Sequence, residues 1–458
     1  MEFKNLKIAV TGMGVSGISI AKAAKKRGAK PVVYDQQPLN TPAGIKKIDQ
    51  LESLGIPVVT SWHGHLDEAD FDILVTSPGF SKDHPAINDA LKAKKPIFSE
   101  VEFAYQILKA PLICITGTNG KSTCTVLTWQ ILKAAGYNAV LCGNISGSGY
   151  PEISLTQAAD HAKETDVLVS EISSFQLEWI QDFRPKVATI TNITPDHLNR
   201  YSGFEDYANT KLKLFQNMGH GDTIVINQAE KTVPDIQNSE SQKAYFDPTN
   251  EHQNNIRIEG DRLIVDDECI DLKELPITSE FQKVNILQSL SLAYAFIGLP
   301  SSEQIQKMFI AIKEFKGLDH RMEYLGEKEG KKVFNNSMCT NPKAVLACLQ
   351  GVQNRMHLLM GGFPKELDYD EVGEFLKNSQ HKVYIYTETD PKFKSQLGDH
   401  WPVFRSIEEA FRIAVDSSDD GEMISLIPGC ASSFPFSNFR ERGERFREIA
   451  QTWLKAPS

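Results

Sequence analysis

Residues 111–123 read Pro111-Leu-Ile-Cys-Ile-Thr116-Gly117-Thr-Asn-Gly120-Lys121-Ser122-Thr123, and this stretch decides the fold around it. The apolar run up to Thr116 predicts a buried strand, and the residues after the glycines predict a helix. The loop resembles a phosphate-binding loop, although Ile115 occupies the first glycine position of the usual GxxxxGK spacing. In such a loop, backbone N–H groups surround phosphates, the lysine reaches the terminal ones and the following hydroxyl can ligate magnesium. The stretch therefore predicts binding of ATP and Mg²⁺.

A second glycine-rich turn follows the first predicted strand of the chain. It reads Gly12-Met-Gly14-Val-Ser-Gly17, opens a predicted helix, and is followed by Asp35 at the end of the next strand. This pattern places backbone N–H groups close to a phosphate at a helix N-terminus. Taken alone, it favours a dinucleotide such as NAD and a dehydrogenase, with another nucleotide or a purely structural turn as alternatives. The predicted ATP site argues against simple hydride transfer.

Strands and helices alternate along all 458 residues, and at roughly 150 residues per domain this length suggests about three domains. We expect an α/β fold with a Rossmann-like N-terminal domain, a central phosphate-loop ATPase domain with a mostly parallel sheet, and a Rossmann-like C-terminal domain. Residues 256–265 alternate on both sides of Gly260-Asp261 and predict a β-hairpin on the central domain. The expected domain ranges are 1–99, 100–317 and 318–458.

The overall composition narrows the classes of partner. The chain is 41% hydrophobic and 24% charged with a formal net charge of −10, so neither nucleic acid nor an anionic membrane is an expected partner. No apolar run reaches the ~18–20 residues of a membrane span, and the start of the chain does not read as a signal peptide. Seven cysteines without a CxxC pair fit a reducing compartment. We therefore expect a cytoplasmic protein.

Two candidate ligands follow other predicted strands. Glu171 closes the strand 166–170, and His197 lies in Thr191-Asn-Ile-Thr-Pro-Asp-His197 after another strand. Considered singly, each is more often a surface or capping residue. Because the carboxyl ends of parallel strands meet at one sheet edge, both are expected near the phosphate loop, where a carboxylate and an imidazole can contact a metal or substrate.

Lys211 is singled out by periodicity. The segment 204–218 reads as a helix on which Tyr207, Ala208 and Leu214 fall on the same face as this lysine, together with other apolar residues. A lysine at the centre of an apolar stripe is expected to be desolvated, which lowers its pKa and frees the amine. Such an amine can add carbon dioxide and become a carbamate, a carboxylate-like metal ligand. The alternative is a buried stem whose ammonium reaches water.

In order along the chain, these motifs resemble the Mur ligase family of peptidoglycan synthesis. The specific signals are the phosphate loop and the stretch Glu171-Ile-Ser-Ser-Phe-Gln-Leu-Glu178. The other matching segments are the N-terminal GxGxxG, Ser77-Pro-Gly79, Gly143-Asn144-Ile145, Asp196-His-Leu198, Lys211, His320-Arg321, Gly361-Gly362 with Lys365, and Cys430-Ala-Ser432 through Asn438-Phe439.

The resemblance implies a role for each matching residue. The UDP-sugar contacts would be Gly14, Ser16, Asp35, Ser77, Gly79 and Asn144. The ATP contacts would be Gly117, Thr118, Asn119, Gly120, Lys121, Ser122, Thr123, Asn285 and Arg321. Two magnesium sites would involve Ser122, Glu171, His197 and Lys211 as a carbamate, and the catalytic set would be Lys121, Glu171, His197 and Lys211. The incoming amino acid would meet Thr340, Lys365, Ser432 and Phe439.

The reaction implied by the resemblance is ATP-dependent activation of a carboxylate as an acyl phosphate, followed by attack of an amino acid. The expected substrates are UDP-N-acetylmuramoyl-L-alanine and glutamate, in the D form, with a monomeric enzyme. Asn336 and Met338 depart from the family pattern, which has an acid and a lysine there. L-glutamate or another amino acid is therefore an alternative, and so is a degenerate nucleotide-binding regulator.

Overall fold

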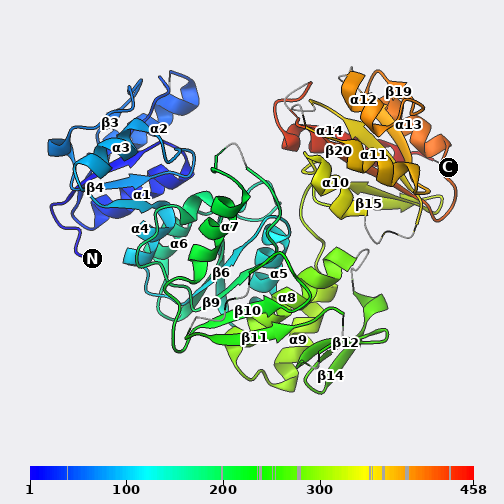
Figure 1. Cartoon of the computed structure of the whole chain (residues 1–458), viewed down its shortest axis with the longest axis horizontal. Helices are drawn as coiled ribbons and strands as arrows, with labels where there is room; N and C mark the ends of the chain where they lie inside the picture. Colours follow the sequence, from blue (N-terminus) through cyan, green and yellow to red (C-terminus); the bar gives the residue numbers. More distant parts are fainter. Residues whose placement is uncertain are drawn as a thin grey trace. The chain divides into compact units, whose positions relative to one another are not determined.

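The computed structural model describes residues 1–38, 40–197, 200–234, 236, 240–249, 251–252, 254–275, 280–349, 352, 354–363, 367–386, 391–432 and 435–457. Its contacts divide the chain, drawn in Figure 1, into two compact units. Unit 1 comprises 1–145, 151–271 and 286–312, and unit 2 comprises 146–150, 272–285 and 313–458. The expected boundaries at 99 and 317 stay predictions.

The first sheet of unit 1 is fully parallel, in the order β3-β2-β1-β4-β5. Its central strands are apolar and buried, as strands covered on both faces must be. The strands are β1 (Lys7–Thr11), β2 (Lys30–Tyr34), β3 (Val58–Val59), β4 (Ile73–Thr76) and β5 (Ile97–Ser99). The helices are α1 (Val15–Lys26), α2 (Pro42–Glu52), α3 (Pro85–Lys92) and α4 (Glu100–Ile107), with a 3-10 turn at Glu68–Asp70.

The second sheet of unit 1 is also parallel, and its order β11-β10-β9-β6-β8-β7 places β6 between β9 and β8. Every residue of β6 is buried, in keeping with its unbroken apolar run. The strands are β6 (Leu112–Thr116), β7 (Asn138–Gly143), β8 (Asp166–Glu171), β9 (Val187–Ile190), β10 (Thr223–Asn227) and β11 (Gln242–Phe246). The helices that follow them are α5 (Lys121–Ala134), α6 (Leu155–His161) and α7 (Phe204–Leu212).

The helix predicted over 204–218 is shorter than expected. The α-helix ends at Leu212 and continues as a 3-10 turn, Lys213–Phe215. Phe204, expected on the buried stripe, is 42% exposed, because it lies at the first turn of the helix. The rest of the predicted stripe is buried.

The predicted hairpin is confirmed, and it belongs to a small antiparallel sheet of three strands, β12 (Ile256–Glu259), β13 (Arg262–Val265) and β14 (Glu268–Asp271). The remaining elements between this sheet and the C-terminal part are the 3-10 turn Leu272–Glu274 and the helices α8 (Glu280–Ile297) and α9 (Ser302–Lys313).

Unit 2 contains a six-stranded sheet in the order β15-β16-β20-β17-β18-β19. Only the edge strand β15 runs antiparallel to its neighbour. Two apolar cores lie on its opposite faces, one against α10–α12 and the other against α13 and α14. The strands are β15 (Glu323–Lys328), β16 (Lys331–Asn335), β17 (Met356–Gly361), β18 (Lys382–Tyr386), β19 (Val403–Phe404) and β20 (Met423–Gly429). The helices are α10 (Pro342–Leu349), α11 (Asp370–Lys377), α12 (Pro391–Leu397), α13 (Ile407–Asp416) and α14 (Phe439–Lys455).

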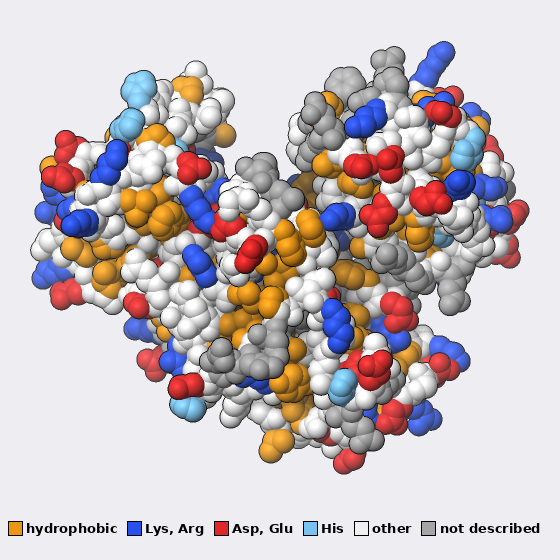
Figure 2. All heavy atoms as spheres, in the orientation of Figure 1, with side chains coloured by type: hydrophobic (Ala, Val, Ile, Leu, Met, Phe, Trp, Pro, Cys, Tyr) orange, Lys and Arg blue, Asp and Glu red, His pale blue; other side chains and the backbone are white. Residues whose placement is uncertain are grey.

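The surface carries both signs of charge. Lys and Arg side chains are interspersed with Asp and Glu over the face drawn in Figure 2. Anionic ligands must therefore be attracted locally rather than by a general field. Among the described residues, no helix combines the length and the apolar character needed to cross a membrane.

Candidate functional site

The phosphate loop connects β6 to α5 and is shaped by two glycines with positive φ. Gly117 has φ +142°, and a Cβ there would collide with the Thr191 hydroxyl at the end of β9. Gly120 has φ +84° and forms the N-cap of α5 without a side-chain capping bond. The loop is held from β9 by Asn192, whose carbonyl oxygen and Oδ1 accept the N–H groups of Thr118 (2.9 Å) and Asn119 (3.0 Å). The start of α5 thus presents the geometry of an anion site.

The sheet order brings Glu171 to this loop. Glu171 is 3% exposed at the end of β8, next to β6. Its Oε2 accepts a short hydrogen bond from the Ser122 hydroxyl in the first turn of α5. Its Oε1 accepts one from Nδ2 of Asn144, which follows the neighbouring strand β7, at 3.2 Å. The structure therefore brings together three residues that lie far apart in the sequence.

These oxygens suit magnesium chemically. A serine hydroxyl and a carboxylate are hard oxygen ligands, and Mg²⁺ usually takes only one or two protein groups plus phosphates and water. No group of three or more His, Cys, Asp or Glu side chains gathers as metal ligands in the described part of the chain.

Lys211 approaches the same loop from α7. Its side chain is buried, and its Nζ donates to the Gly117 carbonyl at 2.7 Å and lies 4.7 Å from the centre of the Tyr207 ring. Burial, reinforced by the charge of Lys121, lowers the pKa of Lys211 to about 6. The amine is therefore mostly neutral at pH 7. Burial excludes the alternative of an ammonium that reaches water.

His197 and Lys121 complete the predicted catalytic set. The Nζ of Lys121 donates to the Thr118 carbonyl at 2.8 Å. His197 has φ +52°, and its ring packs edge-on against Phe175 with centroids 4.9 Å apart. Desolvation lowers the pKa of His197, Asp196 raises it, and the positive charge of Lys121 lowers it further. Burial therefore favours the neutral form of the imidazole, the form in which a ring nitrogen can bind a metal. Leu198 of the matching segment lies outside the described residues.

Apart from Asn144, the predicted UDP-sugar residues lie at the carboxyl edge of the first sheet. Asp35 accepts the N–H groups of Met13 (2.7 Å) and Gln37 (2.9 Å), so its carboxylate fixes the glycine-rich turn. The Ser77 hydroxyl donates to the Thr11 carbonyl at 2.5 Å and joins the second loop to the first. Ser16 lies in the first turn of α1 and is partly buried. Nothing lies within 4 Å of a Cβ placed on Gly14 or Gly79, so both face open space.

In unit 2, Phe439 is the predicted amino-acid residue that begins α14. The Phe439 carbonyl accepts a hydrogen bond from the Ser337 hydroxyl (2.7 Å), three residues before the partly buried Thr340. Ser432 is largely buried just after β20. Of the predicted nucleotide contacts assigned to this unit, Asn285 is buried on α8 and Arg321 is partly buried before β15. Lys365 lies outside the described residues.

Arg442 was missed by the sequence analysis. It is 0% exposed, and its guanidinium donates to the Ser337 hydroxyl (3.0 Å) and carbonyl (2.8 Å) and to the carbonyls of Cys430 (3.1 Å) and Ala431 (3.3 Å). It therefore joins the turn after β16 to the end of β20. An arginine within an amphipathic helix gives no sequence signal of such burial.

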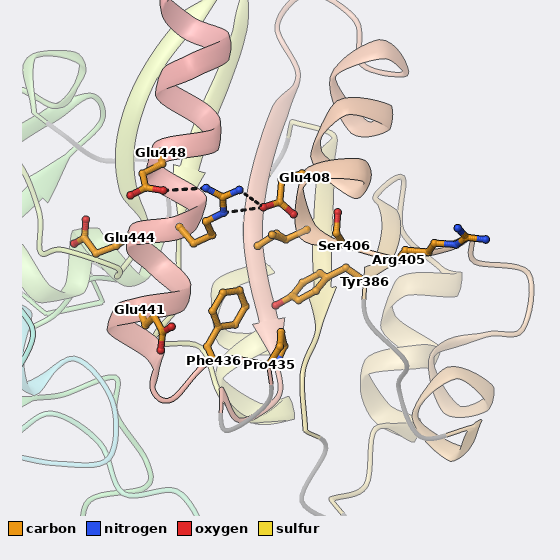
Figure 3. Close-up of a pocket in the computed structure, with 11 residues that line it drawn as sticks. Tyr386, Arg405, Ser406, Glu408, Pro435, Phe436, Glu441, Glu444 and Glu448 are labelled. Atoms are coloured by element: carbon orange, nitrogen blue, oxygen red, sulfur yellow. Dashed lines mark hydrogen bonds and ion pairs between the residues drawn. The ribbon is translucent and has the colours of Figure 1, made fainter.

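A cavity of about 580 Å³ also opens in unit 2, between α13, α14 and residues 435–436 (Figure 3). Arg445 lines it and pairs with Glu408 (2.7 Å) and Glu448 (3.0 Å), so its positive charge is already engaged by two carboxylates. None of the predicted site residues lines it. The cavity is lined by Tyr386, Arg405, Ser406, Ile407, Glu408, Pro435, Phe436, Glu441, Glu444, Arg445 and Glu448.

Known proteins share this sequence and fold. Residues 115–293 match the Mur ligase middle domain, and residues 6–99 match the Mur ligase MurD-like N-terminal domain. A UDP-N-acetylmuramoylalanine–D-glutamate ligase of Caldanaerobacter subterraneus is 33% identical over 98% of both chains, and that of Koribacter versatilis is 32% identical over 98% of both. The solved UDP-N-acetylmuramate–alanine ligase of Thermotoga maritima shares the fold, with a TM-score of 0.58 at 17% identity over 98% of this chain and all of that one. On this evidence, the chain belongs to the Mur ligase family.

Proposed function

We propose that this protein is an ATP-dependent ligase that adds glutamate, in the D form, to UDP-N-acetylmuramoyl-L-alanine. The observation that carries the proposal is the convergence of the phosphate loop, the Ser122–Glu171 pair and the buried amine of Lys211 at one sheet edge. Full-length similarity to ligases of that name supports the choice of substrates. The dehydrogenase alternative loses its support, since the GxGxxG turn belongs to a Mur ligase domain.

The chemistry requires two anions, a carboxylate and a triphosphate, to meet. Positive charge must offset both, and preorganised groups do this most effectively in a site shielded from water. The amides of residues 117–123 and Lys121 would hold the phosphates of ATP. Ser122 and Glu171 would hold Mg²⁺, which supplies charge neutralisation when bound. The sugar-linked carboxylate would become an acyl phosphate, and the amine of glutamate would then displace phosphate.

A second metal site needs one more anionic ligand near His197, and Lys211 can supply it as a carbamate. The reaction R–NH₂ + CO₂ → R–NH–COO⁻ + H⁺ requires the neutral amine, which the burial of Lys211 favours. The resulting carboxylate would act with Glu171 and His197.

Different parts of the chain would bind the UDP-sugar, ATP and glutamate. The UDP end of the sugar nucleotide would be held by Gly14, Ser16, Asp35, Ser77 and Gly79. Asn144 would contact the same substrate beside Glu171. Asn285 and Arg321 would complete the nucleotide site. The glutamate pocket would be formed by Thr340, Lys365, Ser432 and Phe439.

The segment 335–341 differs from the family pattern in its charges: the family's acid at 336 would help hold the nucleotide, and its cation at 338 would lie near the amino-acid site. Asn336 is buried, its Oδ1 accepts the Met322 N–H (3.3 Å), and its Nδ2 donates to the Cys348 sulfur (3.0 Å). The amide is thus used within the protein, where the family has an acid. With methionine at 338, one cation is missing, and L-glutamate stays the main alternative acceptor. We further propose that the enzyme acts as a monomer in the cytoplasm, since ATP and UDP-linked precursors are cytoplasmic metabolites.

Product analysis tests the proposal. ADP release is measured with UDP-N-acetylmuramoyl-L-alanine and a panel of D- and L-amino acids, and the products are identified by mass. We expect ADP release to require both substrates and to be greatest with D-glutamate. Transfer of ¹⁸O from the labelled carboxylate to phosphate would establish the acyl phosphate. ATP binding without turnover on any muramoyl substrate would instead favour the regulator.

A further inference from the structure

Arg200 is the hub of a buried network within unit 1. Its Nε and one terminal nitrogen donate to the two oxygens of Glu178, at 2.9 and 2.8 Å. The same terminal nitrogen donates to the Phe80 carbonyl at 2.7 Å, and the guanidinium carbon lies 4.0 Å from the centre of the Phe175 ring. One side chain therefore contacts both the segment 175–178 and Phe80, which lies 120 positions earlier in the sequence.

The environment makes this arrangement rigid. The Arg200 side chain is 11% exposed and that of Glu178 is 1% exposed. Removing an ion pair from water is costly, so such a pair persists only with good geometry and further hydrogen bonds. A planar guanidinium provides both by binding a carboxylate with two parallel bonds while stacking on an aromatic ring. Lysine has neither the fork nor the plane.

Arg200 holds the position of His197 in two ways. Its backbone N–H donates to the His197 carbonyl at 2.9 Å, and His197 itself has a φ of +52°. Its guanidinium covers Phe175, whose ring packs edge-on against the imidazole. A shift of Arg200 would therefore move both the backbone and the ring that orient this imidazole.

The same side chain is tied to the predicted UDP-sugar loop. Phe80 follows Gly79, and its N–H donates to the Ser77 carbonyl at 3.1 Å, so its own carbonyl belongs to a tight turn. The Phe80 ring lies 6.5 Å from that of Trp62 at the edge of the first sheet. Movement of this turn on ligand binding would displace the Arg200 guanidinium directly, because the Phe80 carbonyl is hydrogen-bonded to it.

An aromatic path continues from Arg200 to the phosphate loop. Phe175 packs near Tyr201, with ring centroids 6.2 Å apart, and Tyr201 packs against Tyr207 at 5.4 Å. The Tyr207 hydroxyl is hydrogen-bonded to Oγ1 of Thr118 at 3.1 Å. Close-packed side chains transmit displacements because they have little room to absorb them.

We propose that Arg200 is a positioning residue that couples occupancy of the UDP-sugar loop to the placement of His197 and the phosphate loop. The inference rests on the proposed function, because it assumes that 77–80 holds the nucleotide sugar. It predicts that binding of the sugar nucleotide tightens binding of ATP, and that this coupling depends on the fork of Arg200.

The test compares Arg200→Lys with the wild type and with a matched control, Arg184→Lys. Arg184 also pairs with a buried acid, Asp222 (2.6 Å), and it lies at the opposite, amino edge of the second sheet. We expect Arg200→Lys to lower kcat by about 10- to 100-fold, the effect of misplacing reacting groups by about 1 Å, and to raise KM for the UDP-sugar but not for glutamate. Arg184→Lys should leave kcat and the KM for the UDP-sugar unchanged.

A binding measurement separates coupling from folding. The Kd of a non-hydrolysable ATP analogue is measured with and without the UDP-sugar, at a temperature where near-UV circular dichroism shows each variant folded. The Kd measured without the UDP-sugar, divided by the Kd measured with it, should be well above one in the wild type and near one in Arg200→Lys. An unchanged ratio, or a folded Arg200→Lys with wild-type kcat and KM, would overturn the proposal. If the wild type released no ADP, the proposed function would fail, while the ratio measured with UDP in place of the UDP-sugar would still decide the role of Arg200.

Discussion

The Nζ of Lys211 lies 2.7 Å from the carbonyl oxygen of Gly117, so a helix residue reaches the backbone of the phosphate loop 94 positions earlier in the chain. The contact lies in a site from which water is almost excluded, with Lys211 only 2% exposed. A neutral amine can donate this hydrogen bond without a buried net charge. The same neutrality makes the amine reactive toward carbon dioxide.

Loss of this amine should abolish the ligase reaction. We expect Lys211→Ala to lose roughly 100-fold or more in kcat, because a group acting on developing charge is removed. Added formate or acetate should restore part of the activity by occupying the position of the missing carbamate carboxylate. Bicarbonate should act in the same way but more weakly. With ¹³C-bicarbonate, the wild type should show a carbamate signal that Lys211→Ala lacks. Lys213→Ala removes a half-buried lysine two residues away and should keep both the activity and the signal.

The buried lysine should also cost stability in a pH-dependent way. Its pKa is about 6 in the folded protein against an ordinary 10.5, so between these values the unfolded chain holds a proton that the folded one lacks. The free energy of unfolding should therefore rise with pH across this window and level off below about 6.

Lys211→Met should remove that contribution to the pH slope. In buffer depleted of carbon dioxide, the variant should be more stable at pH 7 by up to roughly 5 kcal/mol, since a lysine of ordinary pKa no longer has to lose its proton on folding. Denaturant unfolding of the wild type and the variant at several pH values measures this difference in the free energy of unfolding. A variant that is less stable than the wild type at pH 7 would show that the amine is stabilised by the fold.

Glu171 can be neutralised with little change of shape. In Glu171→Gln, the amide oxygen can still accept the Ser122 hydroxyl, so the melting temperature should change by only a few degrees. The lost charge should raise the Mg²⁺ concentration needed for half-maximal ADP release by roughly tenfold or more and lower kcat. A variant with an unchanged magnesium requirement would contradict the ligand role of Glu171.

Arg442 should matter for both stability and glutamate binding. Arg442→Lys leaves several of the acceptors at Ser337, Cys430 and Ala431 unpaired and should destabilise unit 2 by roughly 2–4 kcal/mol. KM for glutamate should rise because Ser432 follows Ala431 directly. Arg445→Lys, which changes an exposed ion pair in the same helix, should cost at most about 1 kcal/mol and keep KM.

Much of this molecule could be predicted from local pattern. The alternation of short apolar runs and helices indicated the α/β class, and Gly260-Asp261 marked the hairpin. Periodicity marked Lys211 as buried, because a helix face is a local property. Where the helix ended was not predictable, since the 3-10 turn after Leu212 follows from packing around it rather than from a breaker residue.

By itself, the sequence determined which residue types follow which strands: the glycines and Lys121 after β6, Asn144 after β7 and Glu171 at the end of β8. Only the tertiary structure decided that these ends are neighbours, because strand order depends on which sheet faces pack together and not on any local propensity. It also decided the roles of Arg200 and Arg442, whose side chains are buried by segments far away in the chain. A guanidinium acquires such a role only when the backbone carbonyls and the carboxylate that it bonds have been assembled around it.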